Sequence, residues 1–517
     1  MDHHLTNLTM TTNVHTMVTE AHDMTTKAFT DVKAPVEVPN GTINKSQPGP
    51  KFRSKYRHVA ALHSKVQPSC LSHETPETPS FIGFRNLMVL TIIVMNLRLV
   101  VENAKKYGLL ITLKSNLRSQ DIKTALVLYA LTPCHLFVAY IIERVAMENA
   151  KGVVGRRKKT DPDGKTPETE KEKKDFYYTW WWIAVAHTLN ASLALLITSS
   201  VVYYHIHNPG LGMISELHAI VVWLKTCSYA FTNRDLRHAM LHPGGPESAL
   251  PEIYSKCPYP RNISLGNLCY FWWAPTLVYQ PCYPRTERVR WSFFFKRLGE
   301  VVALSVFIWL TCAQYAVPVL HNSLGGMAVL DFSAIAERLM KLSTISLIVW
   351  LAGFFALFQS FLNALAEIMM FGDRVFYEDW WNSTSLKMYW STWNKPVYHF
   401  MRRHIYSPLL GRGWSHQAAS AWVFVFSGFL HELAVGVPSH SILGVAFLGM
   451  VLQLPLIQCT EPLAKKEGTG KVIGNCIFWI NFVFVGQPLA AMIYFFSWQA
   501  KYGNLSEIGT SNWAAKW

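Results

Sequence analysis

Long apolar runs, almost free of charged residues, recur along this chain from about residue 84 to residue 497. A run of about 20 apolar residues is long enough to cross the hydrocarbon core of a bilayer as a helix. No region shows the alternating strand and helix patterns that are typical of an α/β enzyme. The sequence therefore predicts an all-α integral membrane protein with about nine transmembrane helices. The predicted spans are 84–104, 125–146, 179–204, 212–231, 294–319, 341–367, 418–437, 441–457 and 473–497.

The composition agrees with a membrane protein. Half of the residues are hydrophobic and only 16% are charged, whereas about 25% are charged in soluble domains. The formal net charge is +15, but the basic residues lie beside the spans, where they suit the positive-inside rule and anionic headgroups. We therefore expect membrane lipids, and no nucleic acid, as partners. The nine cysteines are scattered without a CxxC pair, so neither a disulfide framework nor a zinc site is predicted.

The polar N-terminal region differs from the rest of the chain. Residues 1–80 are rich in Thr, His, Pro, Asn and Ser and contain few large aliphatic residues. Such a segment buries too little apolar area to offset the entropy of ordering, so the sequence predicts a disordered tail. It also lacks the apolar core of a cleavable signal peptide. We expect a transmembrane domain over residues 81–517.

The basic loops predict the topology. The loops 147–177, 232–292 and 368–417 are rich in Lys or Arg and are predicted to be cytosolic. With nine spans, this places the N-terminus in the cytosol and the C-terminus in a lumen, although the basic loop 105–124 departs from the pattern. The loop 368–417 is also aromatic and amphipathic. Trp380 and Trp381 suit the headgroup interface, and we expect an interfacial amphipathic helix in this loop.

One ionisable residue stands well inside an apolar run. His431 lies about 20 Å from the start of the span 418–437 and about 9 Å from its end, at a rise of 1.5 Å per residue. An ionisable residue in a membrane span indicates a functional site, and neutral imidazole is well matched to proton transfer near pH 7. The alternative is a polar contact between helices. Ser427 lies on the same helical face, whereas Glu432 points about 100° away.

Two further features carry polar groups into or beside the membrane. Gln453 and Gln487 lie in the last two spans, and each amide makes either a bond between helices or a contact to substrate. The heptapeptide Phe376-Tyr-Glu-Asp-Trp-Trp-Asn382 has an aromatic belt as its simplest interpretation. Two adjacent tryptophans followed by an amide are more specific than a belt requires. The Asn382 amide is a candidate donor to a polarised carbonyl oxygen.

The heptapeptide resembles the FYxDWWN signature of the membrane-bound O-acyltransferase superfamily, in the branch that acylates sterols and diacylglycerol. The matching residues are Phe376, Tyr377, Asp379, Trp380, Trp381 and Asn382. The segments 270–279, 403–406, 427–432 and 486–488 also resemble family motifs, and the details are most similar to type 1 diacylglycerol acyltransferases, those of fungi in particular. Tyr398 departs from the family, which often has histidine at that position.

The resemblance implies a catalytic domain over residues 81–517 in the endoplasmic reticulum membrane. It implies an acyl-CoA:diacylglycerol O-acyltransferase, with acyl-CoA as a substrate, no cofactor, no metal, and a homodimer contacted through the N-terminal segment. His431 is the expected general base and Asn382 the expected stabiliser of charge on oxygen. Arg402, Arg403 or Arg412 either meets the CoA phosphates or is only a topology charge. The expected substrate-binding residues are Trp381, Ser427, Glu432, Gln453, Gln487, Arg403 and His404.

Two other functions remain open. A sterol O-acyltransferase that makes steryl esters shares the heptapeptide. A transporter would use His431 and the buried amides as a polar path, but the sequence shows no internal repeat, which argues against it. The sequence contains no GxSxG, HExxH or P-loop motif, so a covalent serine mechanism has no support.

Overall fold

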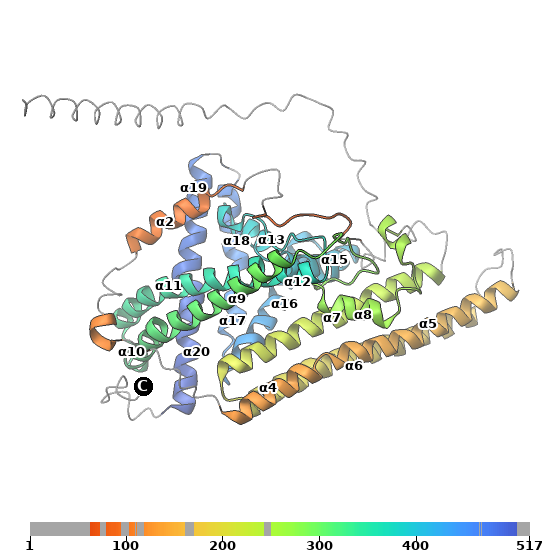
Figure 1. Ribbon diagram of the computed structural model, residues 1–517, viewed down its shortest axis with the longest axis horizontal. Helices are drawn as coiled ribbons and strands as arrows, with labels where there is room; N and C mark the ends of the chain where they lie inside the picture. The colour runs from red at the N-terminus through yellow and green to blue at the C-terminus, as the bar shows by residue number, and fades with distance from the viewer. Residues whose placement is uncertain are drawn as a thin grey trace, which may run out of the picture. The chain divides into compact units, whose positions relative to one another are not determined.

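Helices form the regular structure of this chain (Figure 1). The computed structural model describes residues 61, 63–72, 79–94, 103–108, 110, 118–160, 170–241, 250–464, 466 and 468–503. Across these ranges no strand is present, and the β-pairing consists of two isolated bridges. The prediction of an all-α membrane protein is therefore confirmed.

The longer helices are joined by short 3-10 and π-helical turns. The helices are α2 (Ile82–Val94), α4 (Ser119–Leu131), α5 (Cys134–Thr160), α6 (Glu170–His205), α7 (Pro209–Leu241), α8 (Leu265–Trp273), α9 (Trp291–Thr311), α10 (Val317–Ala328), α11 (Phe332–Phe354), α12 (Leu362–Ile368), α13 (Leu386–Thr392), α14 (Lys395–Met401), α15 (Ser407–Gly411), α16 (His416–Gly436), α17 (Val445–Val451), α18 (Gln453–Ala464), α19 (Thr469–Ile480) and α20 (Gln487–Tyr502). The 3-10 turns are η2 (Glu252–Lys256) and η5 (Trp380–Asn382), and the π-helical turns are η3 (Cys312–Ala316), η4 (Phe355–Phe361), η6 (Arg402–Tyr406) and η7 (Asn481–Gly486).

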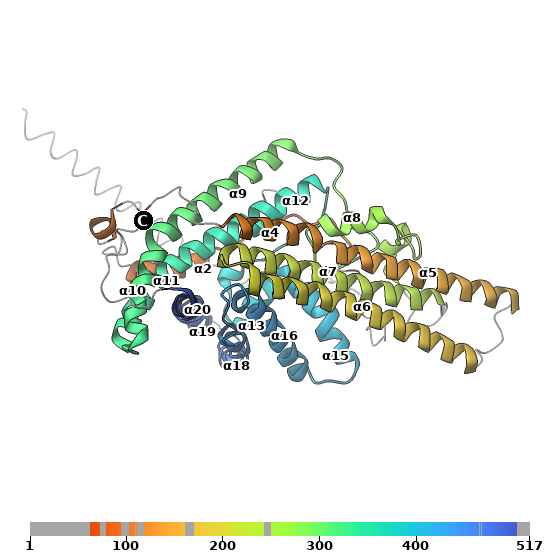
Figure 2. The ribbon, with the colours of Figure 1, turned by 90° about the horizontal axis from the view of Figure 1, so that it is seen from below.

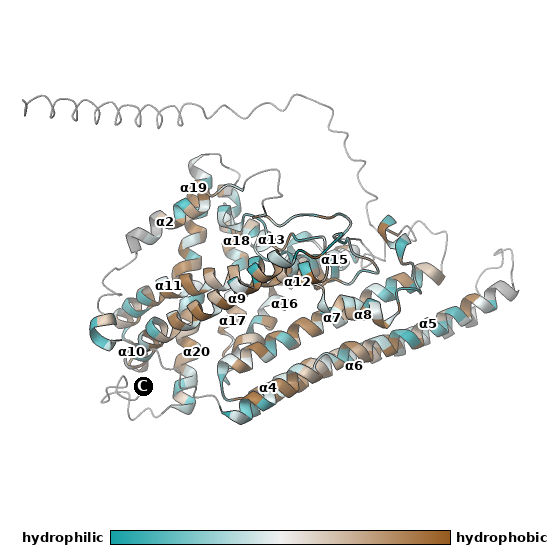
Figure 3. Ribbon diagram, in the orientation of Figure 1, coloured by the Kyte–Doolittle hydropathy of each residue, from teal (hydrophilic) through white to brown (hydrophobic). Residues whose placement is uncertain are grey.

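Seven stretches in the described part of the chain are long and apolar enough to cross a membrane. They coincide with seven of the nine predicted spans, and the chain is a multi-pass membrane protein. Figure 3 shows hydrophobic residues running along helices such as α9 and α11. The seven stretches are Ser119–Arg156, Tyr177–His205, Trp291–Ala328, Phe332–Ile368, His416–Gly436, Val445–Leu463 and Gly470–Tyr502.

The count of nine spans is not confirmed. The predicted span 84–104 begins in α2 and then runs partly outside the described residues. The predicted span 212–231 lies in α7, whose buried side chains include many polar ones. One of them, Lys225, donates from Nζ to the carbonyl oxygens of Phe271, Trp272 and Ala274 at 2.8, 3.0 and 2.9 Å. α7 buries these groups between neighbouring helices, so it does not need a uniformly apolar surface.

The helices pack in groups that recur in both ribbon views. α5, α6 and α7 lie side by side as long helices, with α4 in line with α5 (Figures 1 and 2). α9, α10 and α11 pack together, and α20 packs against α10 and α11. α16 packs against α7, η6 and, most extensively, α17. α16 is therefore held from several sides.

The largest cluster of buried hydrophobic residues is unusually aromatic and has the heptapeptide inside it. Trp380, Trp381 and Trp479 have no accessible surface. Trp380 and Trp381 are therefore buried within the protein and do not form an exposed aromatic belt, although a core and a belt share the same local pattern. Their predicted depth at the headgroup interface stays a prediction. The predicted interfacial amphipathic helix is not confirmed either. The loop 368–417 contains the short helices α13, α14 and α15. α13 and α14 include buried residues such as Leu386 and Phe400, whereas α15 has none.

The predicted disordered tail, 1–80, lies mostly outside the described residues. Within it, residues 63–72 pack on the fold. His63 is buried, and its Nδ1 lies 2.6 Å from Asp373 Oδ2 while its Nε2 lies 3.0 Å from Thr276 Oγ1. Gln67 forms a parallel bridge with Asp373. This short segment thus contacts the loop that leads into the heptapeptide.

Candidate active site

His431 is oriented by the backbone of its own helix. Its Nδ1 lies 2.8 Å from the carbonyl oxygen of Ser427, one turn earlier in α16. A carbonyl oxygen only accepts hydrogen bonds, so Nδ1 carries the proton and donates it. Nε2 is then left with a free lone pair. The Ser427 hydroxyl is farther away, with Oγ 3.5 Å from Nδ1. The imidazole therefore presents Nε2 as an acceptor for a proton.

The His431 side chain keeps accessible surface within the apolar stretch His416–Gly436, which is long enough to cross a membrane. A base at this position meets its substrate within the hydrocarbon region of a bilayer and away from bulk solvent, where its hydrogen bonds are stronger.

Glu432, the next residue, ties α16 to two other helices. Its Oε1 accepts from the Gly444 N–H at 2.9 Å, and its Oε2 accepts from the Phe447 N–H at 3.2 Å and the Tyr494 hydroxyl at 2.7 Å. Gly444 is the N-cap residue of α17, where the orphan N–H groups and the helix dipole favour a carboxylate. Only 8% of the surface of residue Glu432 is exposed. Its observed role is to fix α16 beside α17 and α20, while the predicted substrate contact stays a prediction.

Gln453 and Gln487 both begin helices and are both partly accessible. Gln453 opens α18 and donates from Nε2 to the Gly449 carbonyl at 3.1 Å, which leaves its amide oxygen without a partner among the described groups. Gln487 opens α20 directly after the π-helical turn η7, and its half-buried side chain has no hydrogen bond to a described group. A buried amide needs partners, so both remain suitable for contact with a polar ligand.

Asn382 uses its amide to hold another segment of the chain. Its Nδ2 donates to the Ser80 carbonyl and to Asp379 Oδ2, the latter at 3.1 Å, and its Oδ1 accepts from the Gly83 N–H. An amide nitrogen has two hydrogens, so both donors are engaged. Contact with a charged substrate oxygen would require one of these bonds to break. The role of Asn382 as a charge stabiliser stays a prediction.

The rest of the heptapeptide forms the core around Asn382. The Trp381 indole has no accessible surface, and its Nε1 donates to the Ser80 carbonyl at 2.8 Å. Tyr377 is likewise fully buried and donates its hydroxyl to Gln359 Oε1, 2.6 Å away in the π-helical turn η4. Phe376 and Trp380 lie in the same aromatic cluster. Trp381 thus supports the fold, and its predicted contact with substrate stays a prediction.

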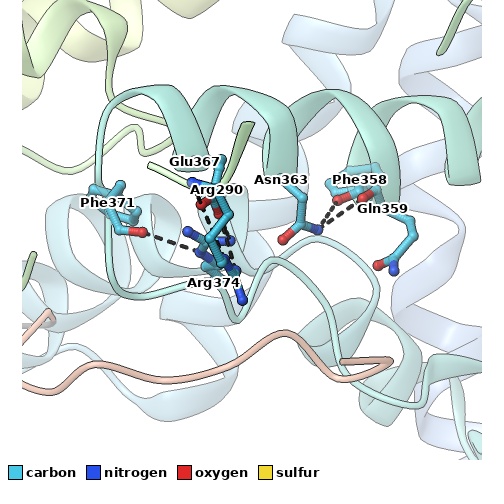
Figure 4. A network of polar contacts seen from close by, with 7 residues as sticks. All are labelled: Arg290, Phe358, Gln359, Asn363, Glu367, Phe371 and Arg374. Carbon is cyan, nitrogen blue, oxygen red and sulfur yellow. Dashed lines mark hydrogen bonds and ion pairs between the residues drawn. The ribbon is translucent and has the colours of Figure 1, made fainter. Parts of the chain in front are cut away.

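A buried ion cluster anchors the chain just before the heptapeptide (Figure 4). The Glu367 carboxylate at the end of α12 has no exposed surface; its Oε1 lies 2.6 Å from the Arg290 backbone nitrogen and its Oε2 lies 2.6 Å from Arg374 Nη1. Arg374 Nε also donates to the Phe371 carbonyl at 3.3 Å. Two guanidinium groups compensate the charge of one buried carboxylate, which would otherwise be costly to bury.

Arg403 and His404 lie in η6, and both are buried. Arg403 donates from Nη1 to the Tyr279 carbonyl at 3.0 Å. His404 Nε2 lies 2.7 Å from the Ser228 hydroxyl on α7. These contacts connect η6 to α7 and to the loop after α8. The prediction that Arg403 meets CoA phosphates, and that His404 binds substrate, is not tested by them.

The structure brings Ser427 and His431 together, and no contact among the described residues joins either of them to Asn382. It also shows partners that the sequence did not indicate. Tyr494 on α20 meets Glu432. Asn475 on α19 donates from Nδ2 to the carbonyls of Trp381 and Ser383 at 3.1 and 2.9 Å. Each partner is about 60 or more positions away in the sequence, and no local pattern predicts such pairs.

Comparison with known proteins matches this arrangement to a family. Residues 176–496 match MBOAT, the membrane-bound O-acyltransferase family. The chain is 34% identical to the protein named diacylglycerol O-acyltransferase 1A of Glycine max, over 87% of this chain and 84% of that protein. It is 34% identical to diacylglycerol O-acyltransferase 1 of Dictyostelium discoideum, over 83% of this chain and 64% of that protein. Identity to diacylglycerol O-acyltransferase 1 of Arabidopsis thaliana is 31%, over 87% of this chain and 80% of that protein.

These relatives and the helical membrane fold support the same assignment. The family match covers more than half of the chain, and it includes both the heptapeptide and His431. The chain belongs to the membrane-bound O-acyltransferase family and is an acyltransferase.

Proposed function

We propose that this chain is an acyl-CoA:diacylglycerol O-acyltransferase that makes triacylglycerol. The orientation of His431 carries the proposal, because it leaves the Nε2 lone pair available on an accessible side chain within the apolar stretch His416–Gly436. The names of the relatives from Glycine max and Dictyostelium discoideum support diacylglycerol as the acyl acceptor. Acyl-CoA is the acyl donor and is consumed as a substrate, with no further cofactor.

The transfer proceeds directly from donor to acceptor. Nε2 of His431 takes the proton from the free hydroxyl of diacylglycerol as the hydroxyl oxygen attacks the thioester carbonyl carbon. The carbon–sulfur bond breaks, and the CoA thiolate takes the proton back from the imidazolium. The Ser427 carbonyl stabilises that imidazolium through Nδ1. Gln453 and Gln487, with their incompletely paired amides, orient the acceptor and donor oxygens.

The cellular setting completes the proposal. The chain resides in the endoplasmic reticulum membrane as a homodimer contacted through the N-terminal segment, with the N-terminus cytosolic and the C-terminus lumenal. The family resemblance supports the membrane and the dimer. The distribution of basic loops supports the topology.

Replacing the base is the direct test. His431→Ala should lower turnover by about 10²–10⁴, as expected for loss of a general base, while thermal stability stays normal. His218→Ala is the matched control, because His218 is a partly buried imidazole on α7 that stacks on Tyr129 with ring centroids 4.3 Å apart. The assay uses purified protein and labelled oleoyl-CoA. Near-normal turnover of His431→Ala would contradict the mechanism.

The acceptor is tested in the same assay. Diacylglycerol, a sterol and a fatty alcohol are offered separately at equal concentrations, and the labelled esters are resolved by thin-layer chromatography. We expect triacylglycerol as the main product. Faster formation of steryl ester would assign the chain to the sterol branch instead.

A further inference from the structure

A cavity lies beside the helix that carries His431. It has a volume of about 260 Å³ and is formed by α7, α14, η6, α15 and α16. Its walls are mainly aromatic and include Trp223 and Phe231 from α7 and Trp422 and Phe426 from α16. A methylene occupies about as much space as a water molecule, roughly 30 Å³ in the liquid. The cavity therefore has room for part of one acyl chain rather than for a whole lipid.

Helix geometry separates this cavity from the candidate active site. At about 100° per residue, Trp422 lies about 180° and Phe426 about 140° around α16 from His431. α16 is one continuous helix over this range. The cavity and the base thus lie on opposite faces of α16. An acyl-CoA molecule held in the cavity would have α16 between its thioester and Nε2 of His431, so the cavity does not suit the acyl donor.

The lining of the cavity includes one cation, Arg412. Arg412 is exposed, and its guanidinium has no hydrogen bond or ion pair to another group in the described ranges. It lies four residues before α16 begins, beside the exposed Trp414. A tryptophan and an arginine next to the start of a span are typical of the headgroup level of a bilayer. Guanidinium groups bind phosphate in a bidentate manner, and an uncompensated cation at this level favours a lipid of net negative charge over a zwitterionic one.

The depth of the cavity fits a lipid that stands upright in the membrane. Trp422 and Phe426 lie about 9 and 15 Å below the first residue of α16, at 1.5 Å per residue. A phosphate at Arg412 would therefore have its acyl chain running down along these two rings. His404, which was expected to bind substrate, also lines this cavity.

We propose that this cavity binds one anionic phospholipid, with the phosphate at Arg412 and one acyl chain between α7 and α16. The bound chain supports α16 from the side opposite His431. Occupancy should therefore favour the productive position of the imidazole and stimulate acyl transfer, a consequence that rests on the proposed function. The binding itself does not depend on that function.

Binding is tested with phosphatidylserine and the purified full-length protein. Native mass spectrometry should show one retained phosphatidylserine on the wild type. Arg412→Gln should weaken retention about fivefold, as expected for one cation at a membrane surface. Leu409→Trp, which fills the cavity from α15, should abolish it. Arg402→Gln removes an exposed cation of η6 that does not line the cavity, and it should bind as the wild type does.

The outcomes are decisive in both directions. Equal retention by the wild type, Arg412→Gln and Leu409→Trp would overturn the proposal. So would displacement of phosphatidylserine by oleoyl-CoA or by oleic acid at lower concentration, since the cavity would then belong to an acyl donor or a free acid. Leu409→Trp is first checked for a normal unfolding midpoint; if it misfolds, the exposed Arg412→Gln decides alone.

Regulation is tested in nanodiscs of phosphatidylcholine with and without phosphatidylserine. The ratio of the rates with and without phosphatidylserine should exceed one for the wild type, whereas the same ratio should fall to about one for Arg412→Gln. Binding without stimulation would overturn the regulatory part alone. If the wild type acylates no diacylglycerol in either disc, the proposed function fails, while the binding result stands.

Discussion

At the residue scale, a single backbone carbonyl determines how His431 can act. Because the Ser427 carbonyl accepts from Nδ1, the proton and the lone pair of the neutral imidazole have fixed places. The carbonyl belongs to the helix and is present whatever side chain stands at position 427. The hydroxyl of Ser427, 3.5 Å from Nδ1, is a weaker partner. The orientation of the base is therefore a property of helix geometry.

Asn382 is the residue at which structure and sequence point to different roles. Asn382→Ala removes bonds to Ser80, Asp379 and Gly83, and we expect thermal stability and turnover to fall together. Asn475→Ala is the matched control, since Asn475 holds the Trp381 and Ser383 carbonyls from α19. Unfolding midpoints and kcat are measured for both variants.

The comparison between the two variants separates the roles. If Asn382 only holds the fold, both variants lose turnover in proportion to stability. A loss of about 10²–10³ in kcat for Asn382→Ala alone, at the stability of Asn475→Ala, would instead identify an oxyanion donor.

His399 predicts how stability depends on pH. Burial, the nearby His63 and the Lys395 ammonium group lower the pKa of His399 to about 4. Between the unfolded pKa near 6.5 and pH 4, the unfolded chain binds a proton that the folded chain does not. Stability should therefore fall as the pH falls through this window. The unfolding midpoint of His399→Gln, measured by thermal unfolding in detergent, should change less with pH than that of the wild type. The control His416→Gln, at an exposed histidine, should behave as the wild type does.

At the element scale, the end of α16 and the turn that leads to α17 depend on close approach at Gly436. A Cβ at Gly436 would lie 2.7 Å from Glu432 Oε1 and 3.2 Å from the Ser441 carbonyl. Glu432 is the residue that caps α17 and meets Tyr494. A side chain at position 436 would therefore displace the group that fixes α16 next to His431.

Substitution of this glycine tests the contact. Gly436→Ala should lower the unfolding midpoint and reduce turnover, because the Glu432 carboxylate must move. Gly449→Ala on α17 is the control, since its added Cβ meets no atom within 4 Å. Alanine is a better helix former than glycine, so the control should be neutral or slightly stabilising. Equal unfolding midpoints for the two variants would show that α16 and α17 tolerate the displacement of the Glu432 carboxylate.

The elements differ in how far the sequence predicts them. Seven spans could be predicted because lipid requires long apolar runs, and each such run leaves a direct mark in the sequence. α7 is harder to place, since its polar side chains are buried by other helices. The burial of the tryptophans in the loop 368–417 could not be predicted, because aromatic residues at an interface and in a core form the same local pattern. The bonds from Asn382 to Ser80 and Gly83 span about 300 residues, and no local pattern contains them.

At the scale of the whole molecule, the contacts that hold the heptapeptide come from both ends of the fold. α2 and the residues before it contact Asn382 and Trp381, and α19 contacts the backbone of Trp381. Residues 63–72 contact the preceding loop: the Gln67 N–H donates to the Gly372 carbonyl at 3.2 Å, and the Arg374 N–H donates to the Gln67 carbonyl at 2.9 Å. The site is thus assembled from segments that are far apart in the sequence.

Two truncations follow from this assembly. Removing residues 1–50 takes away polar chain that contains no predicted span and no candidate site residue, and activity should be retained. Removing residues 1–72 also deletes His63 and Gln67. Their partners Asp373 and Arg374 lie just before the heptapeptide, and the further His63 partner Thr276 follows α8. That variant should unfold at a lower temperature and lose activity. Specific activity is compared at equal oligomeric state, because the N-terminal segment is proposed to contribute to the dimer. Complete loss of activity in intact dimers that lack only residues 1–50 would show that this segment contributes to the site directly.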